Sequence, residues 1–231
     1  MKVMVLTGAG ISAESGIATF RGSDGLWEGH RIEEVATPDG FRRNPQLVHQ
    51  FYNARRRQLL SPEIQPNAAH DALAAFEQSH SGEFLLVTQN IDDLHQRAGS
   101  KNVLPMHGEL LKARCEVTQD VIDWRDDLTT ETIHPESPDL VGTLRPHVVW
   151  FGEMPLGMEE ISRFAAECDV FLAIGTSAVV YPAAGIVELT PDDCETVEIN
   201  LDDTPQSPHF QAAVRGRASV EVPAYLETLA K

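Results

Sequence analysis

Long hydrophobic runs are missing from this chain of 231 residues. No apolar stretch approaches the roughly 20 residues that a membrane-spanning helix needs, so we expect no membrane partner. The sequence also lacks a basic segment followed by an apolar segment and a cleavage site near its start, which is the pattern of a secretory signal. These two absences predict a cytoplasmic protein.

Basic residues are scarce as well. The 18 lysines and arginines are outnumbered by 35 aspartates and glutamates, which gives a formal net charge of −17. Such a charge repels the phosphates of nucleic acids, so we expect no nucleic-acid partner. Solubility explains this acidity more readily than a specific cationic partner does.

The chain has only three cysteines, Cys115, Cys168 and Cys194, which lie far apart in the sequence. An odd number in a chain expected to be cytoplasmic predicts no disulfide framework. Three thiols are also too few for a tetrahedral metal site of four thiolates.

The length suits one large domain, alone or with a small insert. Short, continuously apolar runs predict strands of a parallel sheet that is covered on both faces. The predicted strands are 3–6, 84–87, 102–104, 148–151, 170–174 and 196–199. Helices are predicted at 44–60, 67–78, 157–168 and 223–230, and Asn44 and Asn67 are expected to cap the first two.

The stretch 115–143 differs in composition from the rest of the chain, because it is rich in acidic residues and contains Pro135 and Pro138. More apolar segments flank it on both sides, so we interpret it as an insert. The predicted fold class is α/β, with a Rossmann-like parallel sheet and helices on both faces formed by residues 1–109 and 144–231. Residues 110–143 are predicted to form a small inserted module.

The most informative motif is GAGISAESGIATFRG, which runs from Gly8 to Gly22 directly after the first predicted strand. A glycine-rich turn lets backbone N–H groups approach a phosphate, and a helix N-terminus adds a favourable dipole. Gly8, Gly10 and Ala13 also fit the fingerprint of hydride-transferring dehydrogenases, but no second strand ends in the acidic residue that this fingerprint requires. A dehydrogenase therefore stays an alternative that explains the glycines alone.

Further polar segments follow other predicted strands. TQNIDDLH, 88–95, follows the second predicted strand, and ligands bind at the carboxyl ends of strands in open α/β sheets. Its amides and carboxylate suit a ribose and a carboxamide, although Asn90 and Asp92 would also suit a helix cap. His107 follows another strand, and a neutral histidine is the usual general base near pH 7. His70, on a predicted helix, is expected to be a hydrogen-bonded structural residue.

Together these motifs resemble the sirtuin family of NAD-dependent protein deacylases, and in particular its bacterial CobB-type, class III branch. The resemblance covers nearly the whole chain. It is carried by GAGISAESGI with TFRG, TQNID, HGEL, LRPHVVWFGEMP, IGTS with Val180-Tyr181-Pro182, and the segments at Asn200 and Ala218.

The resemblance implies NAD as co-substrate and a tunnel for the acyl-lysine side chains of partner proteins. In the family reaction the acyl oxygen displaces nicotinamide from the ribose, a histidine deprotonates the ribose, and water releases lysine and O-acyl-ADP-ribose. His107 would be the base, and Asn90 the second catalytic residue. Carried over by position, the NAD-binding residues are Gly8, Ala9, Gly10, Ser12, Glu14, Ile17, Phe20, Arg21, Trp27, Gln89, Asn90, Ile91, Asp92, Gly175, Thr176, Ser177, Asn200, Leu201, Asp202 and Ala218.

The acyl group is suggested by Tyr52 and Arg55, which lie three residues apart on one face of a predicted helix. A phenol and a guanidinium that converge there would fit one carboxylate. The pair resembles the class III signature for succinyl, malonyl or glutaryl lysine, and Ala36 would leave room for the longer chain. From spacing alone, Arg55-Arg56-Arg57 would also suit a solvated basic face.

The chain departs from the family at the structural zinc, which sirtuins hold by two cysteine pairs. Only Cys115 stands at such a position, and Thr118 occupies the place three residues on. We therefore expect no zinc, and a module held by packing of Ile122, Trp124, Leu128 and Ile133. The alternative function is a sensor that binds NAD or ADP-ribose with little or no turnover.

Overall fold

A computed structural model describes residues 1–19, 26–27 and 29–229. Six strands form one parallel sheet in the order β13-β12-β11-β1-β4-β5. The chain runs outward from β1 through β4 to β5, and then returns to β11 on the other side of β1. The point where the order reverses lies between β1 and β11, which is where ligands bind in such sheets. The strands are β1 (Lys2–Thr7), β4 (Glu83–Thr88), β5 (Val103–Pro105), β11 (Val170–Ile174), β12 (Glu195–Asn200) and β13 (Ala212–Arg215).

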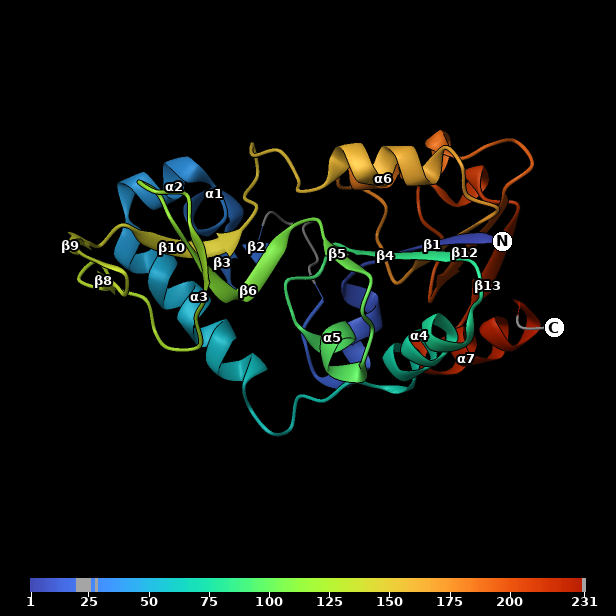
Figure 1. Cartoon of the computed structure of the whole chain (residues 1–231), viewed down its shortest axis with the longest axis horizontal. Coiled ribbons are helices and arrows are strands. Elements are labelled where there is room, and N and C mark those ends of the chain that lie inside the picture. Colours follow the sequence, from blue (N-terminus) through green and yellow to red (C-terminus); the bar gives the residue numbers. More distant parts are fainter. Residues whose placement is uncertain (20–25, 28, 230–231) are drawn as a thin grey trace.

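Successive side chains of the buried strands point to opposite sides of the sheet, and helices pack against both sides. Val3 and Val5 face helices α4 (Ala68–Ser79) and α7 (Ala218–Leu229). Met4 and Leu6 face α6 (Met158–Ala165) and the 3₁₀ helix η3 (Ala183–Leu189). Figure 1 shows α6 on one side of the sheet and α4 with α7 on the other. The predicted Rossmann-like α/β class is confirmed.

A second lobe lies beyond the carboxyl ends of these strands (Figure 1). It holds the antiparallel sheet β10-β6-β7 and two small hairpins, β2-β3 and β8-β9. Its helices are α1 (Ile32–Val35), α2 (Pro38–Arg43) and α3 (Pro45–Leu59). Its strands are β2 (Leu26–Trp27), β3 (His30–Arg31), β6 (Gly108–Cys115), β7 (Val121–Asp123), β8 (Ile133–His134), β9 (Ser137–Val141) and β10 (Leu144–Val148). The remaining elements are η1 (Ala9–Ser15), α5 (Leu94–Ala98) and η4 (Ser207–His209).

Most predicted elements are present. Asn44 caps α3, since its side chain accepts the N–H of Leu47 at 3.1 Å, and Pro45 opens the helix. Asn67 caps α4 by accepting the N–H of Ala69 at 3.0 Å. The strands predicted at 3–6, 84–87, 102–104, 170–174 and 196–199 all lie in the parallel sheet.

Two predicted elements are wrong in part. The strand predicted at 148–151 ends at Val148, and it belongs to β10, which pairs antiparallel with β6 outside the main sheet. The run beyond Val148 is apolar because Trp150 is buried in the core of the small lobe. The last helix begins at Ala218, five residues before the predicted start.

The core of the small lobe joins two separate segments of the chain. Val48, Phe51 and Tyr52 of α3 pack with Leu110 of β6 and with Trp150. The division at residues 110 and 143 stays a prediction, and from this packing we infer that α1, α2 and α3 belong with the inserted module rather than with the sheet.

The module has a small core of its own. Leu128 is fully buried with Cys115, and Ile122 and Trp124 pack against them. Ile133 is 56% exposed, so its predicted role as an anchor is wrong.

Helix α3 also holds the module through buried polar side chains. Asn53 donates from Nδ2 to the carbonyl of Leu128 at 2.8 Å and accepts the Leu128 N–H at 2.9 Å. Arg56, which is fully buried, donates to the carbonyls of Leu110 at 3.1 Å and Asp126 at 3.2 Å. Burial lowers the pKa of Arg56 to about 10, so the side chain stays charged at neutral pH. These bonds satisfy module backbone that lies away from water.

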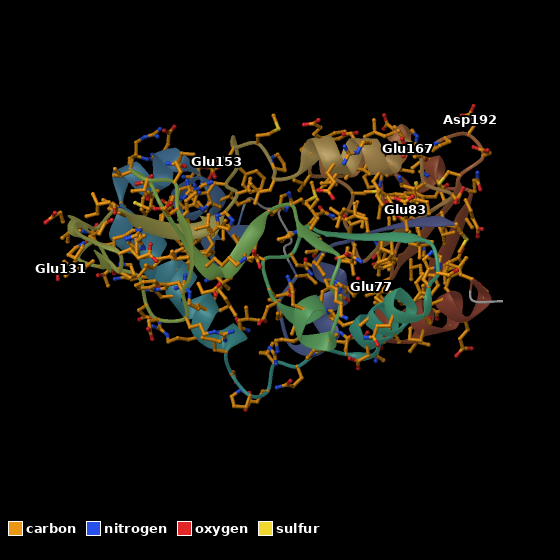
Figure 2. The ribbon with its side chains drawn as sticks, viewed as in Figure 1. Glu77, Glu83, Glu131, Glu153, Glu167 and Asp192 are labelled. Atoms are coloured by element: carbon orange, nitrogen blue, oxygen red, sulfur yellow. The ribbon has the colours of Figure 1, made fainter. Side chains whose placement is uncertain are left out.

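The labelled acidic side chains in Figure 2 do not gather in one place. Glu131 lies at the tip of the small lobe, Glu77 lies in α4, Glu83 begins β4, and Glu167 follows α6. This spread agrees with an acidity that serves solubility. Among the helices in the described residues, none is long and apolar enough to cross a membrane. The cytoplasmic location stays a prediction.

We predict that Asn53→Ala lowers the free energy of unfolding by about 2 kcal/mol, because it leaves the N–H and carbonyl of Leu128 unpaired in a buried place. Urea titration followed by circular dichroism measures this loss. Arg57→Ala is the matched control, since Arg57 is exposed and pairs with Asp127 at the surface, where such pairs contribute about 0–1 kcal/mol. Equal losses in the two variants would contradict the assigned role of Asn53.

Candidate functional site

The centre of the site is a backbone contact between the turns that follow β1 and β11. The N–H of Gly8 donates to the carbonyl of Ile174 at 2.9 Å, and the N–H of Gly10 donates to that of Gly175 at 2.8 Å. A Cβ added at Gly10 would lie 2.7 Å from the Cα of Gly175. Gly175 itself has a φ of +60°, where its own Cβ would lie 2.5 Å from the Ile11 nitrogen. The glycines therefore allow the two turns to meet at the point where the strand order reverses.

A buried hydroxyl, Ser12, connects the turn after β1 with the loop after β4. Its Oγ accepts from Asn90 Nδ2 at 3.1 Å and donates to Asp92 Oδ2 at 3.0 Å. His70 Nε2 lies 3.5 Å from the same Oγ. Because His70 Nδ1 accepts the N–H of Asn67 at 3.3 Å, its proton lies on Nε2 and points to Ser12. His70 is the hydrogen-bonded structural residue that the sequence predicts.

Asn90 is held by both hydrogens of its amide nitrogen, since Nδ2 also donates to the carbonyl of Gly8 at 3.2 Å. Its Oδ1 is therefore the atom left to accept from a ligand. Asp92 fills the helix-cap role that the sequence left open, and its role in binding NAD stays a prediction. Its Oδ1 accepts the N–H of Leu94 at the start of α5, at 3.1 Å, and its Oδ2 faces Ser12. Burial raises the pKa of Asp92 to about 6.

The other predicted NAD-binding segments meet around the turn after β11. Gln89 Nε2 donates to Thr176 Oγ1 at 3.0 Å, and Asn200 Nδ2 donates to the Thr176 carbonyl at 2.7 Å. Glu14 accepts the N–H of Ser219, next to Ala218 at the start of α7, at 3.2 Å. Ala9 is the first residue of η1, and Ser177, Leu201 and Asp202 continue the loops after β11 and β12. Phe20 and Arg21 lie outside the described residues.

His107 lies between β5 and β6, with Nδ1 3.0 Å from the carbonyl oxygen of Gln89. Because a carbonyl oxygen only accepts, Nδ1 carries the proton and Nε2 keeps its lone pair. Burial lowers the pKa of His107, although the hydrogen bond to Gln89 opposes this. The ring is therefore neutral at pH 7, and Nε2 is the atom that can take a proton.

One cavity of about 70 Å³ joins the two lobes. Asp92 and Ile91 reach it from the loop after β4, and Arg55 reaches it from α3. Ile17 and Trp27, which the sequence places at the NAD site, also line it. The remaining lining residues are Ala18, Gln58, Leu59 and Leu110.

Sequence reasoning missed Gln58 and Leu110 as cavity residues. Gln58 stands three residues after Arg55, so the helical spacing that singled out Arg55 would also have found Gln58. Leu110 is the last residue of the HGEL motif, and its position there was the available signal.

The predicted acyl-binding pair is only partly brought together. Arg55 donates from Nη1 to the carbonyl of Phe51 at 2.8 Å, and its guanidinium lies 3.4 Å from the Phe51 ring centre and 5.3 Å from that of Trp27. Tyr52 is fully buried and does not line the cavity. Its ring centre lies 6.1 Å from that of Trp27, so Arg55 and Tyr52 contact the same indole. Ala36 is buried in the surrounding core.

The three consecutive arginines have separate roles. Arg55 lines the cavity, Arg56 is buried against the module, and Arg57 is exposed and pairs with Asp127. A solvated basic face therefore describes Arg57 alone.

Within the described ranges, no group of three or more His, Cys, Asp or Glu side chains could hold a metal ion. The Sγ of Cys115 accepts the N–H of Thr118 at 3.5 Å and donates to Thr143 Oγ1 at 3.5 Å. Burial raises the pKa of this thiol, but these hydrogen bonds outweigh it and bring the pKa to about 7. Cys168 and Cys194, distant in sequence, lie with their Sγ atoms 3.5 Å apart. The absence of zinc stays a prediction.

A parallel sheet covered by helices on both faces, with glycine turns meeting where the strand order reverses, defines the dinucleotide-binding, Rossmann-like class of α/β proteins. Comparison with known proteins narrows the class. The model of the Sir2 family matches residues 8–182, and the chain belongs to this family of enzymes. The sirtuin resemblance is thereby confirmed.

Two curated relatives match almost the whole chain, and both are named NAD-dependent protein deacylase. The protein of Rhodopirellula baltica is 64% identical, and the match covers 98% of each chain. That of Escherichia coli is 58% identical, with 100% of this chain and 82% of the relative covered.

Solved structures agree with these relatives. A Sir2 homologue in complex with NAD has a TM-score of 0.86 and 38% identity, covering 99% of this chain and 90% of the other. A Sir2 homologue mutant in complex with ADP-ribose has a TM-score of 0.87 and 39% identity, covering 97% and 90%. A Sir2 complex with a p53 peptide and NAD⁺ has a TM-score of 0.83 and 29% identity, covering 98% and 92%.

Three buried histidines in and around the site predict sensitivity to acid. Burial lowers the pKa of His49 and His70 to about 4 and that of His95 to about 3. The unfolded chain protonates histidines near 6.5, so it binds more protons than the folded chain below that pH. Stability should therefore fall as the pH drops from about 6.5 to 4, by about 1.4 kcal/mol per pH unit for each histidine. Asp92 opposes this partly, because its raised pKa lets the folded state bind a proton first.

Urea titrations at pH 7.5, 6 and 5 measure this slope. His49→Phe should reduce this slope by the share of one histidine, about 1.4 kcal/mol per pH unit, since neither ring nitrogen of His49 has a hydrogen-bond partner among the described residues. An unchanged slope in His49→Phe would show that this histidine does not titrate as its burial demands.

Proposed function

We propose that this protein is an NAD-dependent protein-lysine deacylase that removes succinyl and malonyl groups as well as acetyl groups. The observation that carries the proposal is the cavity that brings Arg55 of the small lobe together with Asp92 of the loop after β4. The names of the curated relatives support the deacylase activity. The NAD and ADP-ribose complexes of the structural neighbours support the co-substrate.

The residues present fit NAD. The glycine turns meet where the strand order reverses, which favours the approach of a pyrophosphate to backbone N–H groups. Asn90 keeps Oδ1 as an acceptor for a hydroxyl, and Leu201, which is 63% exposed, offers an apolar surface to a base. In this proposal NAD supplies the ribose from which nicotinamide is released.

In the reaction His107 holds and moves the proton. Its Nε2 takes the proton of a ribose hydroxyl, while the bond from Nδ1 to Gln89 keeps the ring oriented. Asp92 and Asn90 hold the nicotinamide end through positions fixed by Ser12. Ile17, Trp27 and Ile91 exclude water from the reacting carbon, which limits hydrolysis before the acyl group arrives.

Arg55 would select the acyl group. Its guanidinium offers fixed donors at the cavity, and a carboxylate at the end of a succinyl or malonyl chain would pair with it. Ala36, which is small and buried in the core of the small lobe, would leave room for the longer acyl chain.

We predict that Arg55→Met lowers kcat/KM for a succinyl-lysine peptide by about a hundredfold, because a charge-assisted pair is lost, and that for an acetyl-lysine peptide by less than threefold. Nicotinamide release from NAD, followed by mass spectrometry, measures both. Arg57→Met, which changes an exposed arginine of the same helix, is the control. Equal losses on both peptides would exclude the carboxylate pairing.

His107→Ala should abolish peptide-dependent nicotinamide release and product formation while NAD binding by calorimetry persists, since the change removes the base and not the turns that hold the co-substrate. Unchanged turnover would remove His107 from this role. A wild-type protein that binds NAD but consumes none with any acyl peptide would be the sensor, and production of NADH would indicate a dehydrogenase.

A further inference from the structure

Two buried thiols lie side by side at the end of the main sheet that faces away from the small lobe. The Sγ atoms of Cys168 and Cys194 are 3.5 Å apart, and the two residues are 2% and 1% exposed. Both are free thiols in the structure. Figure 2 labels Glu167 and Asp192, which stand close to them in the sequence, at this end of the molecule. The candidate functional site lies at the carboxyl ends of the strands, so neither thiol belongs to it.

The backbone sets the distance between the two cysteines. Cys168 precedes β11 and Cys194 precedes β12, and these strands pair in parallel with Val170 opposite Glu195. The N–H of Glu195 donates to the Asp169 carbonyl at 2.8 Å, so the pairing continues to the point where Cys194 lies one residue out of register with Cys168. Neighbouring strands lie about 4.8 Å apart and rise about 3.3 Å per residue, which puts the two Cα atoms about 6 Å apart. Disulfides span Cα separations of about 4.4–6.8 Å.

The surroundings keep the two thiols facing each other. Both belong to the apolar core between the sheet and α6, together with Ile161 and Phe171. Cys168 Sγ donates to the carbonyl of Ala165, the last residue of α6, at 3.2 Å, which holds its side chain in place. A disulfide brings its sulfurs to about 2.0 Å, so each sulfur has to move by less than about 1 Å. The oxidised pair has no S–H left to satisfy, so an apolar core suits it.

We propose that Cys168 and Cys194 are a site of disulfide formation, which takes a small disulfide such as oxidised glutathione as its oxidant. One cysteine thiolate attacks the S–S bond of the oxidant, becomes bonded to one glutathione and releases the other in reduced form. The second cysteine thiolate then attacks the cysteine sulfur of this mixed disulfide and releases the second glutathione. The two cysteines are oxidised and the oxidant is reduced, and the two thiol protons of the protein end on the two released glutathione thiols.

Burial controls the rate of this reaction. It raises the pKa of Cys168 and, together with the neighbouring thiol, brings that of Cys194 to about 12, so little thiolate is present at neutral pH. The bond therefore forms when the starts of β11 and β12 open locally, or while the chain folds. Once closed, it joins two adjacent strands and encloses 168–194, which includes β11 and η3. A closed loop of this kind restricts the unfolded chain, so the bond should stabilise the fold.

Refolding in a redox buffer tests the proposal. The full chain is unfolded in urea, diluted into reduced and oxidised glutathione, alkylated with iodoacetamide and digested for mass spectrometry. Three cysteines allow three pairings. Peptides joined through Cys168 and Cys194 should exceed each pairing that contains Cys115 at least tenfold, because folding holds these two sulfurs together and places Cys115 in the module. The oxidised protein should melt roughly 5–10 °C above the same protein reduced with dithiothreitol.

Cys115→Ser is the matched control, because it removes the third thiol and leaves a hydroxyl for the bonds to Thr118 and Thr143. It should keep both the joined peptides and the shift in melting temperature. Cys168→Ala should lose both, so that its melting temperature no longer depends on the oxidant.

Equal yields of the three pairings would overturn the proposal, as would Cys168 and Cys194 that stay reduced or carry glutathione without a bond between them. A bond that forms but leaves the melting temperature unchanged, or lowers it, would contradict the stabilising role. The test needs neither NAD nor an acyl peptide, so its result is independent of the proposed function.

Discussion

The structure depends on one close backbone contact, in which the turn after β1 meets the turn after β11. Only glycine at positions 8, 10 and 175 allows this approach, because a Cβ at any of them would lie within 2.8 Å of backbone in the facing turn. The contact places Thr176 where Gln89 and Asn200 can both bond to it, at 3.0 and 2.7 Å. The loops after β4, β11 and β12 are thus built around a single point, and the hydroxyl of Ser12 extends this construction to Asn90 and Asp92.

Helix α3 transmits the position of the module to the cavity. Asn53 and Arg56 bind the module backbone on one side, while Arg55 and Gln58 reach the cavity on another. A helix is stiff over its four turns, so the cavity wall is placed by the same bonds that hold the module. These polar bonds form an anchor that does not involve cysteine, in a chain whose only module cysteine, Cys115, is bonded to Thr118 and Thr143.

The sequence was sufficient for features that local chemistry determines. Asn44 and Asn67 cap their helices because a short amide side chain reaches its own helix N-terminus, and the buried strands read as apolar runs because both of their faces are covered. Gly8, Asn90 and Asp92 lie at strand ends for the same topological reason. Partners distant in the sequence were not predictable in this way. Arginine is usually a surface residue, yet Arg56 is buried because the carbonyls of Leu110 and Asp126 accept hydrogen bonds from its guanidinium. The strand predicted at 148–151 failed because burial of Trp150 in the small lobe gives the same apolar signal as a strand.

Burial gives the site its chemistry as well as its shape. The same loss of water that lowers the pKa of His107 raises that of Asp92 to about 6. Desolvation disfavours the charged form of each group, so it makes the base neutral and ready to take a proton, and it weakens the acidity of the carboxyl group. His70 and His95 beneath them are subject to the same effect, with ring centres 4.8 Å apart and both pKa values well below 6.5. Two neutral imidazoles can pack at that distance with their planes tilted by 55°, whereas two imidazolium ions would repel each other. Protonation of His70 and His95 would therefore destabilise the fold. The conditions that keep them neutral also keep His107 in the neutral form that the proposed reaction needs.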